Sequence, residues 1–271
     1  MPAPQPFRVA AVQTVSGGDV AANLAQAEPL VAAAAARGAR LVVLPEYFGI
    51  LGARATDKLA VREQDGTGRQ QEWLAAQARE HGIWLVGGTV PLACDDPGRV
   101  RSACLVHGPE GARVARYDKI HLFAFAQGDE RYDEGKTIEP GSALAAFEAP
   151  CGRVGLSVCY DLRFPELYRG LGELALILVP AAFTATTGAA HWHLLLRARA
   201  VENQCYVLAA AQGGEHPNGR RTYGHSLLID PWGEIVDECA EGPGIVVGDV
   251  DPARLAEVRA QLPALAHRVF R

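Results

Sequence analysis

The sequence lacks a hydrophobic segment long enough to cross a lipid bilayer. Its N-terminal segment, MPAPQPFRVA, also lacks the basic stretch followed by an apolar stretch that is typical of a secretory signal peptide. Because insertion into a membrane and secretion both require such segments, we expect no membrane partner. The protein is therefore expected to be cytoplasmic.

Cysteine is present, but in no arrangement typical of a metal centre. The six cysteines form no CxxC pair, and no group of cysteine and histidine has the spacing of a zinc site. Reduced thiols are what a cytoplasmic location favours. We expect no metal and no cofactor, although ligands that are distant in the sequence can still meet in the folded chain.

Positive charge is not in excess. The 271 residues include 26 Lys and Arg against 31 Asp and Glu, which gives a net charge of −5 and a pI near 5.9. Proteins that bind nucleic acid carry a basic field against the phosphates, so no nucleic-acid partner is expected. No repeat, low-complexity linker or shift in composition marks a boundary, and we expect residues 1–271 to form one domain.

Apolar segments alternate with amphipathic segments along the chain. The apolar, β-branched segments predict strands at 7–14, 39–46, 83–91, 102–111, 111–119, 145–159, 174–181, 205–212, 223–236 and 244–251. The amphipathic segments predict helices at 19–38, 67–82, 164–173, 187–203 and 251–262. Pro29 predicts a kink or an interruption in the first helix. The alternation indicates an α/β protein, and the hairpin signal at 102–119 indicates a mixed sheet or two packed sheets.

Three residues with chemically useful side chains follow expected strands directly: Glu46, Lys119 and Cys159. Catalytic groups collect at the carboxyl ends of strands in α/β folds. A carboxylate can take the proton of a thiol, and an ammonium can stabilise the thiolate and an oxyanion. The combination predicts acyl transfer through a cysteine nucleophile. The GxSxG motif of serine hydrolases is absent from the sequence.

Each of these residues also has an ordinary structural interpretation. Cys159 can be a core thiol, Glu46 a solvated loop residue and Lys119 a surface charge. Cys159 differs from the other cysteines because the polar turn Tyr-Asp-Leu-Arg-Phe-Pro follows it. That turn into a helix predicts a thiol at a helix N-terminus, where the dipole favours the thiolate.

Three segments of the chain resemble the catalytic motifs of the nitrilase superfamily. They are LVVLPEYF (41–48), RYDKIHLF (116–123) and GRVGLSVCYDLRFPEL (152–167). They occur in the order and at the separations usual for that family, and the resemblance runs from about residue 7 to the C-terminus. It implies a four-layer α-β-β-α sandwich that dimerises through its helices.

The resemblance also implies roles for individual residues. Glu46 matches the general base, Lys119 the residue that stabilises the intermediate, and Cys159 the nucleophile. Glu134 matches a second glutamate that orients the lysine or the substrate amide. The backbone N–H of Tyr160 would complete the oxyanion hole.

The segment 181–236 is similar to the Nit branch of the superfamily, and closest to its deaminated-glutathione amidases. That branch implies hydrolysis of the amide of deaminated glutathione to α-ketoglutarate and cysteinylglycine. The alternatives are an ω-amidase acting on α-ketoglutaramate, another nitrilase or carbamoylase, and a catalytically idle scaffold or binding protein on the same fold. One departure is His193, where the family usually has glutamate, and it bears on the substrate assignment.

Further residues have two open interpretations each. Arg163 is a candidate ligand for a substrate carboxylate, or it pairs with Asp161 or Glu166 to hold the turn. Three residues after the strand 174–181 are expected either to line the pocket or to pack the loop: Phe183, Thr184 and Thr187. The segment Phe123–Arg131 is a candidate lid.

The helix 187–203 has an apolar stripe that predicts core or dimer interface, formed by Leu194, Leu195, Ala198 and Val201. Arg199 and Glu202 are expected to pair on the opposite face of this helix. His225 is expected to be a hydrogen-bonded core histidine rather than a catalytic one.

Overall fold

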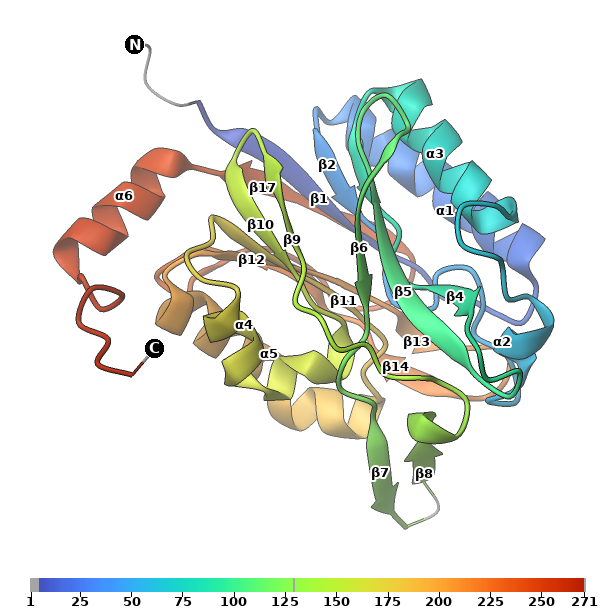
Figure 1. Cartoon of the computed structure of the whole chain (residues 1–271). Coiled ribbons are helices and arrows are strands. Elements are labelled where there is room, and N and C mark those ends of the chain that lie inside the picture. Colours follow the sequence, from blue (N-terminus) through green and yellow to red (C-terminus); the bar gives the residue numbers. More distant parts are fainter. Residues whose placement is uncertain (1–4, 129, 271) are drawn as a thin grey trace.

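The computed structural model describes residues 5–128 and 130–270 and is built around two sheets (Figure 1). The first sheet has the strand order β17-β1-β2-β3-β5-β4, and β6 pairs with β5. Its strands are β1 (Phe7–Gln13), β2 (Leu41–Val43), β3 (Trp84–Val86), β4 (Val90–Ala93), β5 (Val100–His107), β6 (Arg113–Asp118) and β17 (Gly244–Val250). Strands β1, β2 and β3 run parallel and their outer neighbours antiparallel, so the expected mixed sheet is confirmed.

The second sheet has the strand order β16-β15-β12-β11-β10-β9. Its strands are β9 (Ala146–Ala149), β10 (Gly152–Leu156), β11 (Leu176–Ala181), β12 (Tyr206–Ala211), β15 (Ser226–Ile229) and β16 (Ile235–Cys239). Two hairpins lie outside both sheets: β7 (Ala124–Gln127) with β8 (Glu130–Asp133), and β13 (Gly213–Glu215) with β14 (Arg221–Tyr223).

The side chains of β1 alternate between two hydrophobic cores. Val9 and Ala11 face the core shared with the second sheet, whereas Ala10 and Val12 face the core beneath two helices, α1 (Val20–Ala36) and α3 (Arg69–His81). The outer face of the second sheet is covered by α4 (Pro165–Gly170) and α5 (Ala185–Asn203), and Figure 1 shows the two helix pairs on opposite sides. The expected four-layer α-β-β-α sandwich is thus confirmed.

The remaining helical elements are short or peripheral. They are α2 (Asp57–Ala60), α6 (Pro252–Gln261) and the 3₁₀ turns η1 (Glu134–Lys136) and η2 (Cys159–Arg163). None of the helices in residues 5–128 and 130–270 combines the length and the apolarity needed to cross a bilayer.

Two local expectations need correction. Pro29 does not interrupt α1, because it lies on the exposed face of the helix, where water can hydrogen-bond the carbonyl that lacks a donor. The strand expected at 83–91 is two strands, β3 and β4, separated at Gly88. This glycine has φ +37°, and a Cβ there would lie 1.9 Å from the carbonyl oxygen of Pro45. The turn at Gly88 therefore packs directly against Pro45, the residue before Glu46.

Candidate active site

Lys119 joins the ends of two strands of the first sheet. It follows β6, and its Nζ lies 2.7 Å from Oε1 of Glu46, which follows β2. The same Nζ lies 2.7 Å from Oε2 of Glu134 in η1. The side chains of Lys119 and Glu46 are 0% and 1% exposed, so this is a buried ion-pair cluster and not a surface charge.

Glu134 is fixed by two further hydrogen bonds. The hydroxyl of Tyr47 donates to its Oε1 at 2.7 Å, and the backbone N–H of Phe123 donates to its Oε2 at 2.7 Å. Tyr47 itself has φ +60°, and its backbone N–H donates to Oγ1 of Thr89 at 2.9 Å. The carboxylate of Glu134 is therefore held in place by the surrounding chain.

Cys159 lies where the second sheet meets this cluster. It follows β10 and begins η2 with φ +51°, in the left-handed region that side chains other than glycine rarely adopt. The carboxylate of Asp161 holds this turn, accepting from the N–H of Val158 at 2.8 Å and from the hydroxyl of Tyr117 at 2.7 Å. It also accepts from the N–H of His121 at 3.0 Å, so one carboxylate fixes the cysteine turn and the loop after Lys119.

The relative position of the two sheets is fixed beside the cluster by Gln212. This residue follows β12 of the second sheet, and its Nε2 donates to the backbone oxygen of Glu46 at 3.0 Å. Its Oε1 accepts from the N–H of Ser16 at 3.0 Å. Gln212 and Ser16 are fully buried.

Burial and the neighbouring charges perturb every ionisable group of the cluster. Burial raises the pKa of Glu46, and Lys119 opposes that rise without cancelling it. Burial would lower the pKa of Lys119, but the charges of Glu134 and Glu46 raise it well above its usual value. Burial likewise favours a neutral Glu134, but Lys119 outweighs this and lowers its pKa. The lysine is thus a permanent cation, and Glu46 is the carboxylate best suited to exchange a proton.

The expectation of a dipole-stabilised thiolate at Cys159 is wrong. The thiol is buried beside Glu46, and burial followed by the charge of that carboxylate raises its pKa well above the usual range. The helix that follows is a 3₁₀ turn of 5 residues, too short for a substantial dipole. The raised pKa favours the neutral thiol at Cys159, and the carboxylate of Glu46 lies beside it.

A narrow cavity of about 10 Å³ opens beside Cys159. The three residues expected to line a pocket are found there: Phe183, Thr184 and Thr187. The wall also includes Tyr160, the candidate oxyanion-hole residue, and Arg163, the candidate carboxylate ligand. Thr184 and Thr187 also pack the loop, because Oγ1 of Thr184 accepts from the N–H of Thr187 at 3.2 Å and caps α5.

Arg163 does not pair with Asp161 or Glu166. Asp161 is occupied by Tyr117 and His121, and within residues 5–128 and 130–270 Arg163 forms no ion pair. Its guanidinium lies over the rings of Tyr160 and Phe183 at 5.7 and 5.4 Å from their centroids. The interpretation of Arg163 as a structural ion pair is therefore wrong, and the guanidinium faces the cavity.

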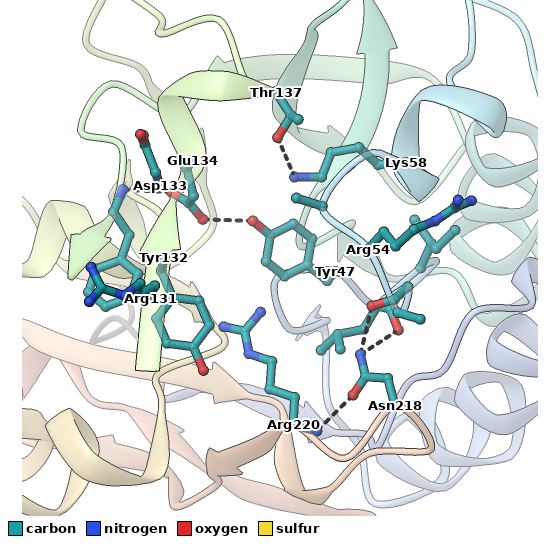
Figure 2. Close-up of a pocket in the computed structure, with 16 residues that line it drawn as sticks. Tyr47, Arg54, Lys58, Arg131, Tyr132, Asp133, Glu134, Thr137, Asn218 and Arg220 are labelled. Carbon is teal, nitrogen blue, oxygen red and sulfur yellow. Dashed lines mark hydrogen bonds between the residues drawn. The ribbon is translucent and has the colours of Figure 1, made fainter. Parts of the chain in front are cut away.

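A larger cavity of about 300 Å³ lies on the other side of Glu134 (Figure 2). Tyr47, Lys58 and Arg220 contribute to its wall, and the sequence indicated a role for none of them. Lys58 belongs to α2 and Arg220 to the segment before β14, where no strand-end pattern marks them. Phe123 contributes to the walls of both cavities.

The candidate lid is a hairpin whose base forms part of this wall. Phe123, Arg131 and Tyr132 line the larger cavity, and the hairpin of β7 and β8 projects from the body of the molecule (Figure 1). The ring of Phe123 packs against Tyr160, with ring centroids 5.2 Å apart. Asp129, within the expected lid, lies outside the described residues.

Helix α5 differs from its expected pattern. Leu194 and Val201 are 67% and 46% exposed, so these two residues of the stripe are not core. Arg199 pairs with Glu202 at 2.8 Å as expected, but on the buried face, where Arg199 also donates to the carbonyl of Leu162. Leu194 and Val201 thus face outward, whereas Leu195 packs partly buried against the core.

His225 is hydrogen-bonded but is not a core residue. Its Nδ1 lies 2.5 Å from Oε1 of Glu238, and the same oxygen lies 2.9 Å from Nε2 of His193. All three side chains are partly exposed. His193 and His225 thus share one carboxylate oxygen of Glu238 in a partly exposed cluster. Each of the three side chains offers one atom that could bind a metal ion, and these atoms lie within 4.8 Å of one another. The spacing of the three residues along the sequence did not indicate that they would meet.

Almost the whole chain is similar to known proteins. Residues 8–260 match the carbon-nitrogen hydrolase family. The chain is 40% identical to the deaminated glutathione amidase of Synechocystis over 98% of its own length and 99% of the relative's. It is 37% identical to the omega-amidase NIT2 of Homo sapiens, over 97% and 95%. Saccharomyces cerevisiae Nit3, a member of branch 10 of the nitrilase superfamily, superposes with a TM-score of 0.86 at 30% identity, over 98% of this chain and 97% of that one.

Proposed function

Because the chain belongs to the carbon-nitrogen hydrolase family, and is therefore a hydrolase of C–N bonds, we propose that Cys159 carries out amide hydrolysis through a thioester. The observation that carries the proposal is the buried Lys119, which holds Glu46 and Glu134 at 2.7 Å beside the thiol. A cation held between two carboxylates costs too much to bury for packing alone. The buried cation has a function if the site must stabilise negative charge that develops during a reaction.

In the first half of the proposed reaction, Sγ of Cys159 attacks the amide carbon while Glu46 takes the thiol proton. The negative charge that develops on the carbonyl oxygen is stabilised by Lys119 and by the backbone N–H of Tyr160. The tetrahedral intermediate then collapses. Glu46 returns its proton to the departing nitrogen, so that the amine leaves neutral and the acyl group stays on sulfur as a thioester.

In the second half, water replaces the amine. Glu46 takes a proton from the water, whose oxygen attacks the thioester carbon, and the same oxyanion donors stabilise the second intermediate. Cleavage of the C–S bond releases the carboxylic acid, and the thiolate regains its proton from Glu46. Glu134 keeps Lys119 in place throughout, because it is the more acidic of the two carboxylates.

We propose deaminated glutathione as the substrate, giving α-ketoglutarate and cysteinylglycine, with α-ketoglutaramate as the alternative. The relatives support both, since amidases of both names match almost the whole chain. Steady-state kinetics on deaminated glutathione, α-ketoglutaramate, an N-carbamoyl amino acid and a nitrile rank the candidates. Efficient turnover of another substrate alongside negligible turnover of deaminated glutathione would refute the main assignment.

Glu46→Gln is expected to lower kcat/KM by about 10²- to 10⁴-fold, because the amide cannot accept the thiol proton. Burial raises the pKa of Glu46, so the wild-type rate should fall as pH drops through a pKa above 4.5, where the carboxylate becomes protonated. The variant should lack this acidic limb. A pH–rate profile of both proteins measures the effect. An unchanged limb in the variant would assign the titration to another group.

We infer that the whole chain is one catalytic domain that forms a homodimer in the cytoplasm. One core joins the two sheets, and the site takes residues from both. The six free cysteines suit a reducing compartment. The exposed stripe of α5 around Leu194 and Val201 offers an apolar surface for a second copy.

Leu194→Asp is expected to shift a dimer toward the monomer, because the introduced charge would be desolvated at the interface. Light scattering after size-exclusion chromatography measures the mass. Leu144→Asp is the matched control, since Leu144 is 45% exposed in the loop before β9 and not on α5. A wild-type monomer, or a dimer that survives Leu194→Asp unchanged, contradicts an α5 interface.

A further inference from the structure

The larger cavity carries an excess of positive charge that the proposed reaction steps do not use. Figure 2 shows Lys58 and Arg220 reaching into it from different elements, with the ring of Tyr47 beside them. Nζ of Lys58 donates to Oγ1 of Thr137 at 3.2 Å, and the guanidinium of Arg220 donates to the carbonyl of Ala182 at 3.1 Å. Both partners are neutral.

Arg54, Asp133 and Glu134 have opposite charges to pair with, whereas Arg131 on the same wall forms no ion pair among the described residues. Arg54 binds Asp57 at 3.0 Å, and Glu134 binds Lys119. Within residues 5–128 and 130–270, neither Lys58 nor Arg220 forms an ion pair. The cavity is therefore lined by three cations that form no ion pair among the described residues: Lys58, Arg131 and Arg220.

The environment of these cations points to an absent anion. Burial lowers the pKa of Lys58 to about 8. The charges of Glu134 and Glu46 oppose this effect, and those of Lys119 and Arg220 add to it. Nε of Arg220 is buried and has no hydrogen-bond partner among the described residues. Both observations describe cationic groups whose hydrogen bonds and charge are incompletely satisfied.

Cys159 and Glu134 border different cavities. Cys159, which keeps the acyl group, faces the narrow cavity with Arg163 and Thr184. Glu134 and Tyr47 border the larger cavity. Glu46, which must protonate the leaving nitrogen, is joined to Glu134 through Lys119. The leaving half of a substrate therefore extends past Glu134 into the larger cavity.

We propose that Lys58 and Arg220 bind a carboxylate on the leaving-amine half of the substrate, so that the larger cavity selects amides whose amine is an amino acid or a short peptide. A lysine ammonium supplies point charge, and a guanidinium can add two parallel hydrogen bonds. The inference rests on the proposed function, and it extends that function from the scissile bond to the group released. A cavity of about 300 Å³ has room for a dipeptide beside Glu134.

The test compares deaminated glutathione with its C-terminal glycinamide form, which has the same length and scissile bond but no carboxylate on the leaving half. Wild type should prefer the acid in kcat/KM by about tenfold or more, since charge-assisted hydrogen bonds are lost with the amide. Lys58→Met should abolish most of this preference by slowing the acid selectively. Lys58→Arg should keep it.

Lys136→Met is the matched control, because it removes the same charge from a side chain that is 77% exposed and does not line the cavity. It should leave the preference at the wild-type value. Arg220→Gln provides an independent variant that should lower the preference as Lys58→Met does. Thermal unfolding of each variant separates loss of folding from loss of selectivity.

Three results would overturn the inference: equal use of acid and amide by wild type, an unchanged preference in both cavity variants, or an equal loss on both substrates. None of these touches the proposed function, which requires only that wild type hydrolyse deaminated glutathione. A wild type that hydrolyses α-ketoglutaramate alone refutes the proposed substrate, and the carboxylate site with it.

Discussion

Replacing Cys159 by alanine is expected to reduce amide hydrolysis by about 10⁴-fold or more, because no other group can form the thioester. The fold should survive, since alanine at this position removes one sulfur atom from a turn that Asp161 holds. Initial rates on deaminated glutathione and on α-ketoglutaramate measure the loss. Both substrates should be affected alike, because both acyl groups would be carried by the same sulfur.

Cys104→Ala is the informative control for this loss. Cys104 is fully buried in β5 and its pKa is raised to about 12 by burial alone, but it belongs to the core and not to the cluster. The Cys104→Ala substitution should lower the free energy of unfolding and leave kcat nearly unchanged. Rapid hydrolysis by a clean Cys159→Ala preparation would refute the nucleophile. Activity lost equally in both variants would show that the assay reports folding.

Lys119→Met is expected to impair both catalysis and stability. Removing the oxyanion cation should lower kcat by about 10³-fold or more, since a single oxyanion donor accounts for 10²- to 10³-fold and the lysine also positions Glu46. The two carboxylates would remain buried without their cation, which should cost about 3–5 kcal/mol of unfolding free energy at neutral pH. Chemical denaturation and initial rates measure the two effects separately.

The stability loss in Lys119→Met should depend on pH in a definite direction. Without the cation, burial raises the folded-state pKa values of Glu46 and Glu134 above their unfolded values. The folded variant then binds more protons than the unfolded chain, so its stability is highest at low pH and falls as pH rises through the raised pKa values. The gap to wild type should be smaller at pH 5 than at pH 8. A gap independent of pH would mean that lost packing dominates.

Much of the catalytic cluster could be predicted because it lies at strand ends. Glu46, Lys119 and Cys159 each follow a strand that the apolar pattern marks, and strand ends of one layered fold meet at a common edge. Glu134 has no such mark, because it lies in a 3₁₀ turn after a hairpin. Only the resemblance to a known family indicated it.

The electrostatic state of the site could not be predicted from the sequence. The thiol of Cys159 was expected to be acidified by a helix, but its pKa depends on burial and on Glu46, which lies far away along the chain. Lys58 and Arg220 were missed for a similar reason. Their importance comes from lacking counter-charges in three dimensions, and the sequence around them has no periodic pattern.

Gln212 holds the two sheets in register beside the site. Glu46 and Lys119 belong to one sheet and Cys159 to the other, so sliding of one sheet over the other changes the distance between base and nucleophile directly. Displacements of about 1 Å at a reacting centre can cost about 100-fold in rate. Gln212 resists that shear because it is hydrogen-bonded across the two sheets at Glu46 and Ser16. The catalytic rate should therefore depend strongly on how the two sheets are aligned. We expect the rate to decline under heat or pressure before either sheet loses its hydrogen bonds.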